Sequence, residues 1–325
     1  MTSHQDDRRT FLKSLGVFTA SVNFFGLSAA ISRPQRFLVG FAPATDGTVD
    51  SYWTRMKALS AAGLRCVEVD NGMVKIAEHY SAKPKEFQER MAQMNLQLVG
   101  VNQPYLFAGS YTGAPADQPS DPAGIREKNT LVARFLSQVG ATYLGWEGGL
   151  APGATEDRAE DEDVARRVAR LANTEGRRVF EEFGIRFTYH THSTFGFRRL
   201  MDLTNPAYLS LNADLGWLAA RGGGDALEIL RAYRSRLLTI HFKDFDPNLN
   251  WQDRGRSGKG GMVVPGKGSV NFPAVVEFLK QSEFDGFVLG EHIGLANYDF
   301  VRSPREVEIY PQYRDYFVGT LGLKL

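Results

Sequence analysis

Eight short apolar runs recur along the chain, and each run ends in polar or glycine-rich residues. They are F-L-V-G-F-A-P from Phe37, L-R-C-V-E-V-D from Leu64, L-Q-L-V-G-V-N-Q-P from Leu96, A-T-Y-L-G-W-E-G-G from Ala141, I-R-F-T-Y-H-T-H from Ile185, L-S-L-N-A-D-L-G-W from Leu209, L-L-T-I-H-F-K-D-F from Leu237 and G-F-V-L-G-E-H from Gly286. Runs of this length, rich in Val, Ile, Leu, Phe and Tyr, are typical of β-strands. The pattern therefore predicts eight strands.

Helical patterns lie between these runs. Residues 53–63 end on a glycine in a C-cap position, residues 165–184 end in the same way, and residues 272–282 carry a proline in the first turn. Strands that alternate with helices form βαβ units and a parallel sheet. Eight such units predict an α/β fold with a single (β/α)8 TIM barrel over residues 33–325. No G-x-G-x-x-G fingerprint follows the first run, which disfavours a dinucleotide-binding sheet.

The first 32 residues are expected to lie outside this barrel. Arg8 and Arg9 precede an apolar run that Ser, Asn and Gly interrupt, and small residues follow at 28–30. This segment resembles a cleavable twin-arginine export signal, and it is too short for a stable membrane span. We therefore expect the bacterial twin-arginine export machinery to carry the chain to the periplasm or beyond, with cleavage near Ala30. A plain amphipathic N-terminal helix is the alternative.

The charge balance argues against a nucleic-acid partner. Lys and Arg number 38 and Asp and Glu number 37, which gives a formal net charge of +1. Nucleic-acid binding needs a concentrated basic surface, and no half of the chain is strongly basic. Cys66 is the single cysteine, so there is no intrachain disulfide, and we expect it to pack as a small buried hydrophobe.

Two long polar segments follow the third and seventh predicted strands. One runs from Gly109 and the other from Asp246, and both leave the C-terminal ends of strands. Active sites of (β/α)8 barrels lie at that end, and long loops in compact domains tend to be functional. We therefore expect these segments to cover an active site.

Candidate site residues gather at the same strand ends. His190 and His192, at i and i+2 of the fifth strand, should point to one face. The other candidates are Asp214 in the sixth run, His241 and Lys243 in the seventh, Glu291 in the eighth, and Glu68, Asn102 and Glu147 in the second, third and fourth. An apolar strand seldom ends on a buried charge unless the charge is paired or binds a metal. Mixed imidazole and carboxylate ligands suit Mn, Co, Zn or Fe(II).

Each of these residues also has a purely structural interpretation. His190 or His241 alone could be a hydrogen-bonded core histidine, and Glu291 could pair with Lys243. An aspartate after a strand usually caps the next helix, as Asp244 could. Four unrelated contacts would, however, have to fall at the same end of four neighbouring strands, so one shared metal site is the better explanation.

The ordered set of motifs resembles the xylose isomerase-like TIM-barrel superfamily of sugar isomerases and epimerases. The matching stretches are Y-H-T-H from Tyr189, N-A-D-L-G-W from Asn212, I-H-F-K-D-F from Ile240, G-K-G-S-V-N-F from Gly266 and L-G-E-H from Leu289. The resemblance covers essentially the whole chain after the N-terminal segment. It implies one divalent metal ion held by His190, Asp214, His241 and Glu291.

One position departs from the isomerases and epimerases of this group. The fifth strand there usually supplies a glutamate that passes a proton between carbons or faces, whereas this chain has His190. A metal-bound imidazole has no free lone pair to act as a base. Relatives with Y-H-x-H include dehydratases of keto-cyclitols, and secreted relatives resemble lyases or hydratases of 3-keto-glycosides. The resemblance therefore implies proton abstraction next to a carbonyl, followed by loss of a β-oxygen substituent.

This interpretation gives the remaining candidates separate roles. We expect His192 to be the acid or base, with Glu291 or Glu147 as the alternative, and Lys243 to stabilise enolate charge. The expected substrate contacts are Glu68 and Asn102 for carbohydrate hydroxyls and a tryptophan such as Trp217 for stacking.

Other functions stay open at the level of sequence. The first is a true aldose–ketose isomerase or 3-epimerase, and the second is a secreted sugar-binding protein without turnover. A Schiff-base aldolase that uses Lys243 is a further alternative, which needs a desolvated lysine and which borohydride trapping with substrate would decide. A metal-dependent endonuclease, also found in this superfamily, is disfavoured by the missing basic surface.

Overall fold

The computed structural model describes most of the chain after residue 33. The described residues are 34–45, 47–70, 72–102, 122–147, 159–191, 197–220, 226–253, 256–291 and 304–325. The predicted export signal, the segment from Gly109 and His192 lie outside them, and so does the side chain of Glu147. The barrel belongs to a compact unit that runs from Arg33 to Leu325.

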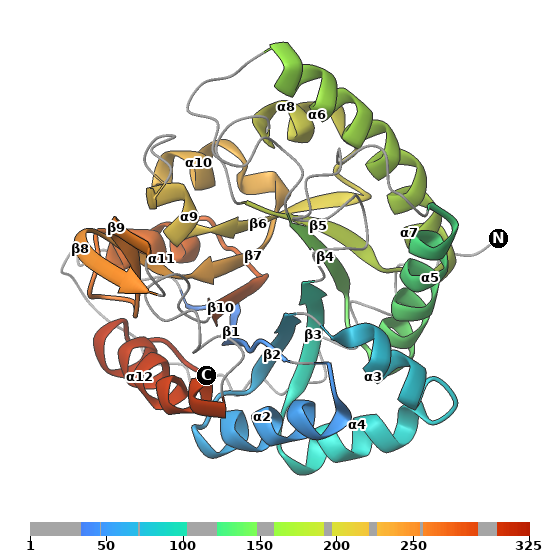
Figure 1. Cartoon of the computed structure of the whole chain (residues 1–325), viewed down its shortest axis with the longest axis horizontal. Helices are drawn as coiled ribbons and strands as arrows, with labels where there is room; N and C mark the ends of the chain where they lie inside the picture. The colour runs from blue at the N-terminus through green and yellow to red at the C-terminus, as the bar shows by residue number, and fades with distance from the viewer. Residues whose placement is uncertain are drawn as a thin grey trace, which may run out of the picture. The chain divides into compact units, whose positions relative to one another are not determined.

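Eight parallel strands close into a barrel, with helices outside it (Figure 1). They are β1 (Leu38–Ala42), β2 (Cys66–Asp70), β3 (Gln97–Asn102), β4 (Tyr143–Glu147), β5 (Arg186–His190), β6 (Leu209–Asp214), β7 (Leu237–Phe242) and β10 (Phe287–Glu291). Neighbours in the barrel follow chain order, and β10 pairs with β1 to close it. The predicted (β/α)8 fold is confirmed, and each strand falls within the apolar run that predicted it.

Helical segments connect the strands. They are α2 (Val49–Ala61), α3 (Met73–Tyr80), α4 (Pro84–Gln93), α5 (Pro122–Val139), α6 (Ala159–Leu171), α7 (Arg177–Phe183), α8 (Phe197–Leu203), α9 (Leu215–Ala220), α10 (Ala226–Ala232), α11 (Phe272–Gln281) and α12 (Tyr310–Asp315), with short turns of other helical types at Ala172–Gly176, Arg234–Arg236, Pro304–Ile309 and Tyr316–Thr320. Helix α7 ends at Gly184, whose φ of 70° is left-handed and suits glycine. Asn271 caps α11 by accepting from the Ala274 N–H.

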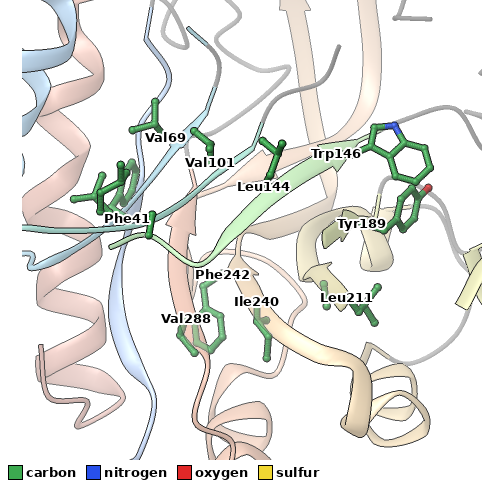
Figure 2. Close-up of a cluster of buried hydrophobic side chains, with 14 of the residues drawn as sticks. Phe41, Val69, Val101, Leu144, Trp146, Tyr189, Leu211, Ile240, Phe242 and Val288 are labelled. Atoms are coloured by element: carbon green, nitrogen blue, oxygen red, sulfur yellow. The ribbon is translucent and has the colours of Figure 1, made fainter. Parts of the chain in front are cut away.

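Alternate strand residues face the helices and form the main core. Val69, Leu144, Ile240 and Val288 belong to this cluster of buried side chains (Figure 2), and Val67 is a further member. Full burial of such a side chain contributes about 1.5–3 kcal/mol each. Because successive side chains of a strand point to opposite faces, the remaining residues of each strand point into the barrel.

The barrel interior holds a second, smaller cluster. Its buried members are Ala42, Cys66, Val99, Tyr143 and Leu289, which all come from strands. Cys66 is buried there as a free thiol, as the sequence predicted. Cys66, Val99, Tyr143 and Leu289 precede the polar candidates of their strands, which lie nearer the C-terminal ends.

The segment after β7 differs from the loop that its sequence suggested. It forms an antiparallel hairpin of β8 (Asp244–Asp253) and β9 (Arg256–Val263), which lies outside the barrel (Figure 1). The sequence of this segment is glycine-rich and polar and lacks the apolar alternation from which strands are predicted. The hairpin is therefore recognised only from its backbone pairing. In the described part of the chain, no helix is long and apolar enough to cross a membrane.

Candidate metal centre

Four strands bring two histidines and two carboxylates to one point. His190, Asp214 and Glu291 are the last residues of β5, β6 and β10, and His241 is the last but one of β7. Asp214 and His241 are direct partners in the β6–β7 register. One ligand atom from each of the four residues lies within 4.8 Å of those of the other three, and all four side chains are buried. We call this set the four-residue cluster.

Asp214 uses its two oxygens for different purposes. Oδ1 accepts a hydrogen bond from the Trp217 N–H at 2.9 Å and so caps α9. Oδ2 lies 3.3 Å from His190 Nε2 and 2.9 Å from Lys243 Nζ. The Asp214 N–H also donates to Thr191 Oγ1 at 2.9 Å. Asp214 therefore caps α9 with Oδ1 and also belongs to the four-residue cluster through Oδ2. The cap fixes the direction in which Oδ2 points.

The His241 ring lies between two carboxylates. Its Nε2 is 2.9 Å from Glu68 Oε1, and its Nδ1 is 2.9 Å from Glu291 Oε2. Burial favours the neutral ring, but the charges and hydrogen bonds of Glu68 and Glu291 raise the pKa of His241 well above its usual value. The His190 ring centroid lies 4.6 Å from that of His241. Without a metal, protonated His241 compensates the buried negative charge.

Lys243 extends from the end of β7 into the same site. Its Nζ lies 2.9 Å from Asp214 Oδ2, 2.7 Å from Glu291 Oε2 and 5.6 Å from the Trp217 ring centroid. Burial favours the neutral amine, but the two carboxylates raise the pKa of Lys243 above its usual value. Burial likewise opposes ionisation of Glu291, yet Lys243 and His241 lower the pKa of Glu291 well below its usual range. The two carboxylates therefore favour the ammonium form of Lys243.

The donor set fits a divalent cation. Two imidazoles and two carboxylates at this spacing match the ligand types of Mn, Co, Zn and Fe(II). The cluster is buried and lies at the C-terminal ends of the strands, which is where barrel active sites form. Lys243 and His241 lie within ion-pair distance of Glu291, so a divalent cation at this place would compete with them for the carboxylate.

Glu68, which the sequence suggests as a substrate contact, lies beside the four-residue cluster. Its side chain is 0% exposed. Oε2 accepts a hydrogen bond from the Tyr143 hydroxyl at 2.6 Å, and Oε1 faces His241 Nε2. The Glu68 carboxylate is therefore buried between Tyr143 and His241.

The other two expected substrate contacts are Asn102 and Trp217. Asn102 is buried at the end of β3, and Trp217 is half-buried in α9 beneath Lys243. Trp53 and Trp146 pack in the core against Tyr80 and Tyr189. Of the tryptophans with described side chains, only Trp217 therefore lies beside the cluster.

Asp244 has a role that the sequence did not indicate. Its Oδ1 accepts from the N–H groups of Phe245 and Val270 at 2.9 and 3.0 Å, and its Oδ2 accepts from those of Gly266 and Gly268 at 3.0 and 2.8 Å. The alternative that it caps the next helix is wrong, because Asn271 caps α11. Asp244 instead joins the base of the hairpin to the G-K-G-S-V segment. A carboxylate followed by closely spaced glycines was the only sign of this in the sequence.

Two further residues at the site were missed. Tyr143 holds Glu68, and the Asn212 side-chain amide lies 3.2 Å from His241 Nε2. Asn212 shares the inward face of β6 with Asp214, so the period of two in N-A-D could have indicated it. Tyr143 gave no such signal, because a tyrosine in an apolar run is typical of a core position.

Comparison with known proteins gives one family and several relatives. The family model described as "Xylose isomerase-like TIM barrel" matches residues 56–303. An inosose dehydratase of Lacticaseibacillus casei is 26% identical over 249 residues, which cover 72% of this chain and 79% of that protein. An inosose dehydratase of Bacillus velezensis is 32% identical over 127 residues, but these are 35% of this chain and 42% of that protein.

Solved structures share the fold. A xylose isomerase domain protein from Planctomyces limnophilus has a TM-score of 0.60 at 17% identity, with 89% of this chain and 97% of that chain covered. The probable 3-DHS dehydratase of Bacillus anthracis has a TM-score of 0.61 at 12% identity, covering 85% and 98%. A xylose isomerase-like TIM-barrel protein from Mycobacterium smegmatis, solved in complex with magnesium, has a TM-score of 0.56 at 13% identity, covering 87% and 96%.

Proposed function

The chain belongs to the xylose isomerase-like TIM-barrel family, and on this premise we propose that it is a metal-dependent lyase that removes a β-oxygen substituent, such as water, from a keto-sugar, keto-glycoside or keto-cyclitol. The main support for this proposal is that β5 contributes a histidine, His190, to the cluster. This histidine is the β5 member of a buried cluster whose other members are Asp214, His241 and Glu291. An imidazole that binds a metal cannot also exchange protons with substrate, which disfavours two-carboxylate epimerisation. The inosose dehydratases among the relatives support elimination from a ketone.

The four-residue cluster would hold the ion. When bound, a divalent cation supplies Lewis-acid stabilisation for the negative charge that develops as a proton leaves the carbon next to a carbonyl. The Lys243 ammonium lies between Asp214 and Glu291 and supplies a second positive group at the same place. Charged groups held in a buried site stabilise developing charge more than they would in water.

The elimination needs one base and one acid. The base takes the proton from the α carbon, the C–H electron pair becomes the C=C bond, and the β C–O bond breaks. The leaving oxygen accepts a proton from the acid and departs, as water where the substituent is a hydroxyl. We propose His192 for proton transfer, because it follows His190 by two residues, with Glu147 or Glu291 as the alternative. Trp217, half-buried beside Lys243, would pack against the apolar face of the substrate ring.

The test is turnover of keto-inositols and 3-keto-glucosides by the purified protein with Mn or Co. We expect a conjugated enone or its tautomer, detected by ultraviolet absorbance and mass spectrometry, and loss of turnover in Asp214→Asn. Asp202→Asn, which changes an exposed aspartate of α8, is the matched control and should keep full turnover. Formation of an isomeric sugar without loss of the oxygen substituent would favour the isomerase alternative. Tight ligand binding without any product would favour the sugar-binding alternative.

We also propose that residues 1–32 direct export. Arg8 and Arg9 ahead of an apolar run are the features that a twin-arginine pathway requires. Fractionation of bacterial cells should find the shortened chain in the periplasm, and Arg8→Lys with Arg9→Lys should retain the full-length chain in the cytoplasm. Export of the double variant at the wild-type level would contradict the proposal.

A further inference from the structure

The C-terminal segment, residues 304–320, contacts both strands of the pair that closes the barrel. In that pair Phe41 of β1 lies opposite Gly290 of β10. Tyr313, in α12, packs its ring edge-on against the Phe41 ring at a centroid distance of 4.9 Å. Its hydroxyl donates a hydrogen bond to the backbone carbonyl of Glu291. The segment therefore reaches the strand end that carries one member of the four-residue cluster.

We propose that Tyr313 is a positioning residue that holds the end of β10, and with it the Glu291 carboxylate, in the place that metal binding requires. Tyr313 acts through the backbone of Glu291, so its role needs no contact with the metal or the substrate. This inference rests on the proposed metal site and assigns one of its supports.

Glu291 needs such support because its strand pairing continues on one side only. Its register partner is Ala42 of β1, whereas the pairing of β10 with β7 ends one residue earlier, at Gly290 and Phe242. A buried backbone carbonyl requires a hydrogen-bond donor, and the Tyr313 hydroxyl supplies one. Metal–ligand distances tolerate deviations of only about 0.2 Å, so a small shift of this strand end would disturb the Glu291 ligand.

The sequence leaves room for the Tyr313 ring beside this strand end. A Cβ atom at Gly290 would lie 2.4 Å from Tyr313 Cδ1 and 2.7 Å from Phe41 Cδ2. Both distances are shorter than van der Waals contact, so a larger residue at this position would displace the tyrosine ring. The glycine of L-G-E-H therefore leaves the space through which Tyr313 reaches Glu291.

The C-terminal segment is also anchored at a second point. Glu306 Oε1 accepts a hydrogen bond from the Ala44 N–H at 3.1 Å, and Glu306 Oε2 lies 3.2 Å from Arg55 Nε. Both charged side chains are buried, with 0% of Glu306 and 4% of Arg55 exposed. Ala44 follows the end of β1 by two residues. The segment is thus attached near β1 through Glu306 and to β10 through Tyr313, and the two attachments fix the direction from which Tyr313 approaches.

The Tyr313→Phe variant tests the assignment, because it keeps the ring and removes the hydroxyl. We expect a roughly tenfold weaker affinity for Co²⁺ or Zn²⁺ in competition with a chelator, the lower end of the loss that follows removal of a group supporting a metal ligand. Tyr310→Phe is the matched control. Tyr310 is also buried in α12, and its ring lies 4.7 Å from that of Phe41. Its hydroxyl interacts electrostatically with Glu306 and Arg55, so this variant should keep the wild-type affinity.

The visible spectrum of bound Co²⁺ separates positioning from a loss of stability, because it depends on the number and geometry of the ligands. A variant that merely weakens the fold keeps the wild-type spectrum in its folded molecules. We therefore expect a changed spectrum in Tyr313→Phe and the wild-type spectrum in Tyr310→Phe. Gly290→Ala displaces the Tyr313 ring and should also change the spectrum, and it decides if Tyr313→Phe does not fold.

The possible failures are distinguishable. Wild-type affinity and spectrum in Tyr313→Phe, or in Gly290→Ala if only that variant folds, would overturn the role of Tyr313 alone. An equal change in Tyr310→Phe would also overturn it, because the effect would then not depend on the hydroxyl that contacts Glu291. Wild-type protein that binds neither Co²⁺ nor Zn²⁺ would overturn the proposed metal site itself.

Discussion

Replacing Lys243 by methionine removes the one lysine ammonium of the described site and keeps most of the side-chain volume. Nζ lies 2.9 Å from Asp214 Oδ2 and 2.7 Å from Glu291 Oε2, and all three side chains are buried. The variant leaves two carboxylates in a desolvated site with only the histidines to compensate them. We therefore expect a marked loss of stability in the metal-free protein.

The magnitude follows from the burial of the pair. Removing one partner of a buried ion pair costs about 3–5 kcal/mol, because the other charge is left without compensation. For a domain of this size class, 1 kcal/mol lowers Tm by roughly 2–4 °C, so Lys243→Met should melt about 6–20 °C below wild type. A bound divalent cation replaces the missing positive charge, and saturating Mn²⁺ should recover a large part of that difference.

Thermal unfolding in EDTA and in Mn²⁺ measures both effects. Lys83→Met is the control, because Lys83 pairs with Glu86 on the surface with 43% and 54% of the side chains exposed. Such a pair contributes little, so the control should melt with the wild type. If Lys243→Met melted at the wild-type temperature in EDTA, the ammonium would not compensate the buried carboxylates. An equal deficit with and without Mn²⁺ would show that the cation and Lys243 do not share them.

Three other residues give sharp expectations. Burial raises the pKa of Glu306 from about 4.5 to about 8, although Arg55 and the Ala44 N–H oppose the shift. The folded state therefore binds this proton more tightly than the unfolded state does. The free energy of unfolding of the wild type, measured by urea titration relative to Glu306→Gln, should fall as pH rises from about 4.5 to about 8. In Asp244→Asn an amide NH₂ replaces one of the two oxygens that accept backbone N–H groups. The substitution should lower the free energy of unfolding by about 1–3 kcal/mol and speed hydrogen exchange at Gly266 and Gly268. Unchanged exchange would contradict these contacts. A Cβ atom added at Gly100 would lie 2.4 Å from the Tyr143 ring, so Gly100→Ala overpacks the barrel interior and should cost about 1–3 kcal/mol; a thermal melt equal to that of the wild type would contradict this close contact.

The barrel was predictable because its determinants are local. Each strand is a short apolar run, and helix boundaries carry chemical signals such as Gly184 and Asn271. The β8–β9 hairpin was not predictable, because its two strands pair with each other while their sequence lacks the apolar alternation of a half-buried strand. The spacing of apolar residues does not predict elements that are stabilised by backbone pairing.

The sequence predicted which site residues point into the barrel, but not how far along the barrel axis each of them lies. The period of two correctly turns His190, Asp214, His241 and Glu291 into the barrel, where the structure brings them together. The same rule turns Glu68 inward but does not say how far along the barrel axis it lies. That depth depends on the register between strands, including the irregularity between Val67 and Glu68, and a single sequence does not encode it in a readable form. The sequence therefore did not indicate that Glu68 lies between Tyr143 and His241.

The central claim is that the four-residue cluster binds a divalent metal. Elemental analysis of the purified full chain, after loading with Mn, Co, Zn or Fe(II) and removal of free ions, tests it most directly. We expect one ion per chain in the wild type and in Asp202→Asn, and loss of that ion in Asp214→Asn. Wild-type protein that retains no stoichiometric amount of any of these metals, or Asp214→Asn that retains as much as wild type, would contradict the claim.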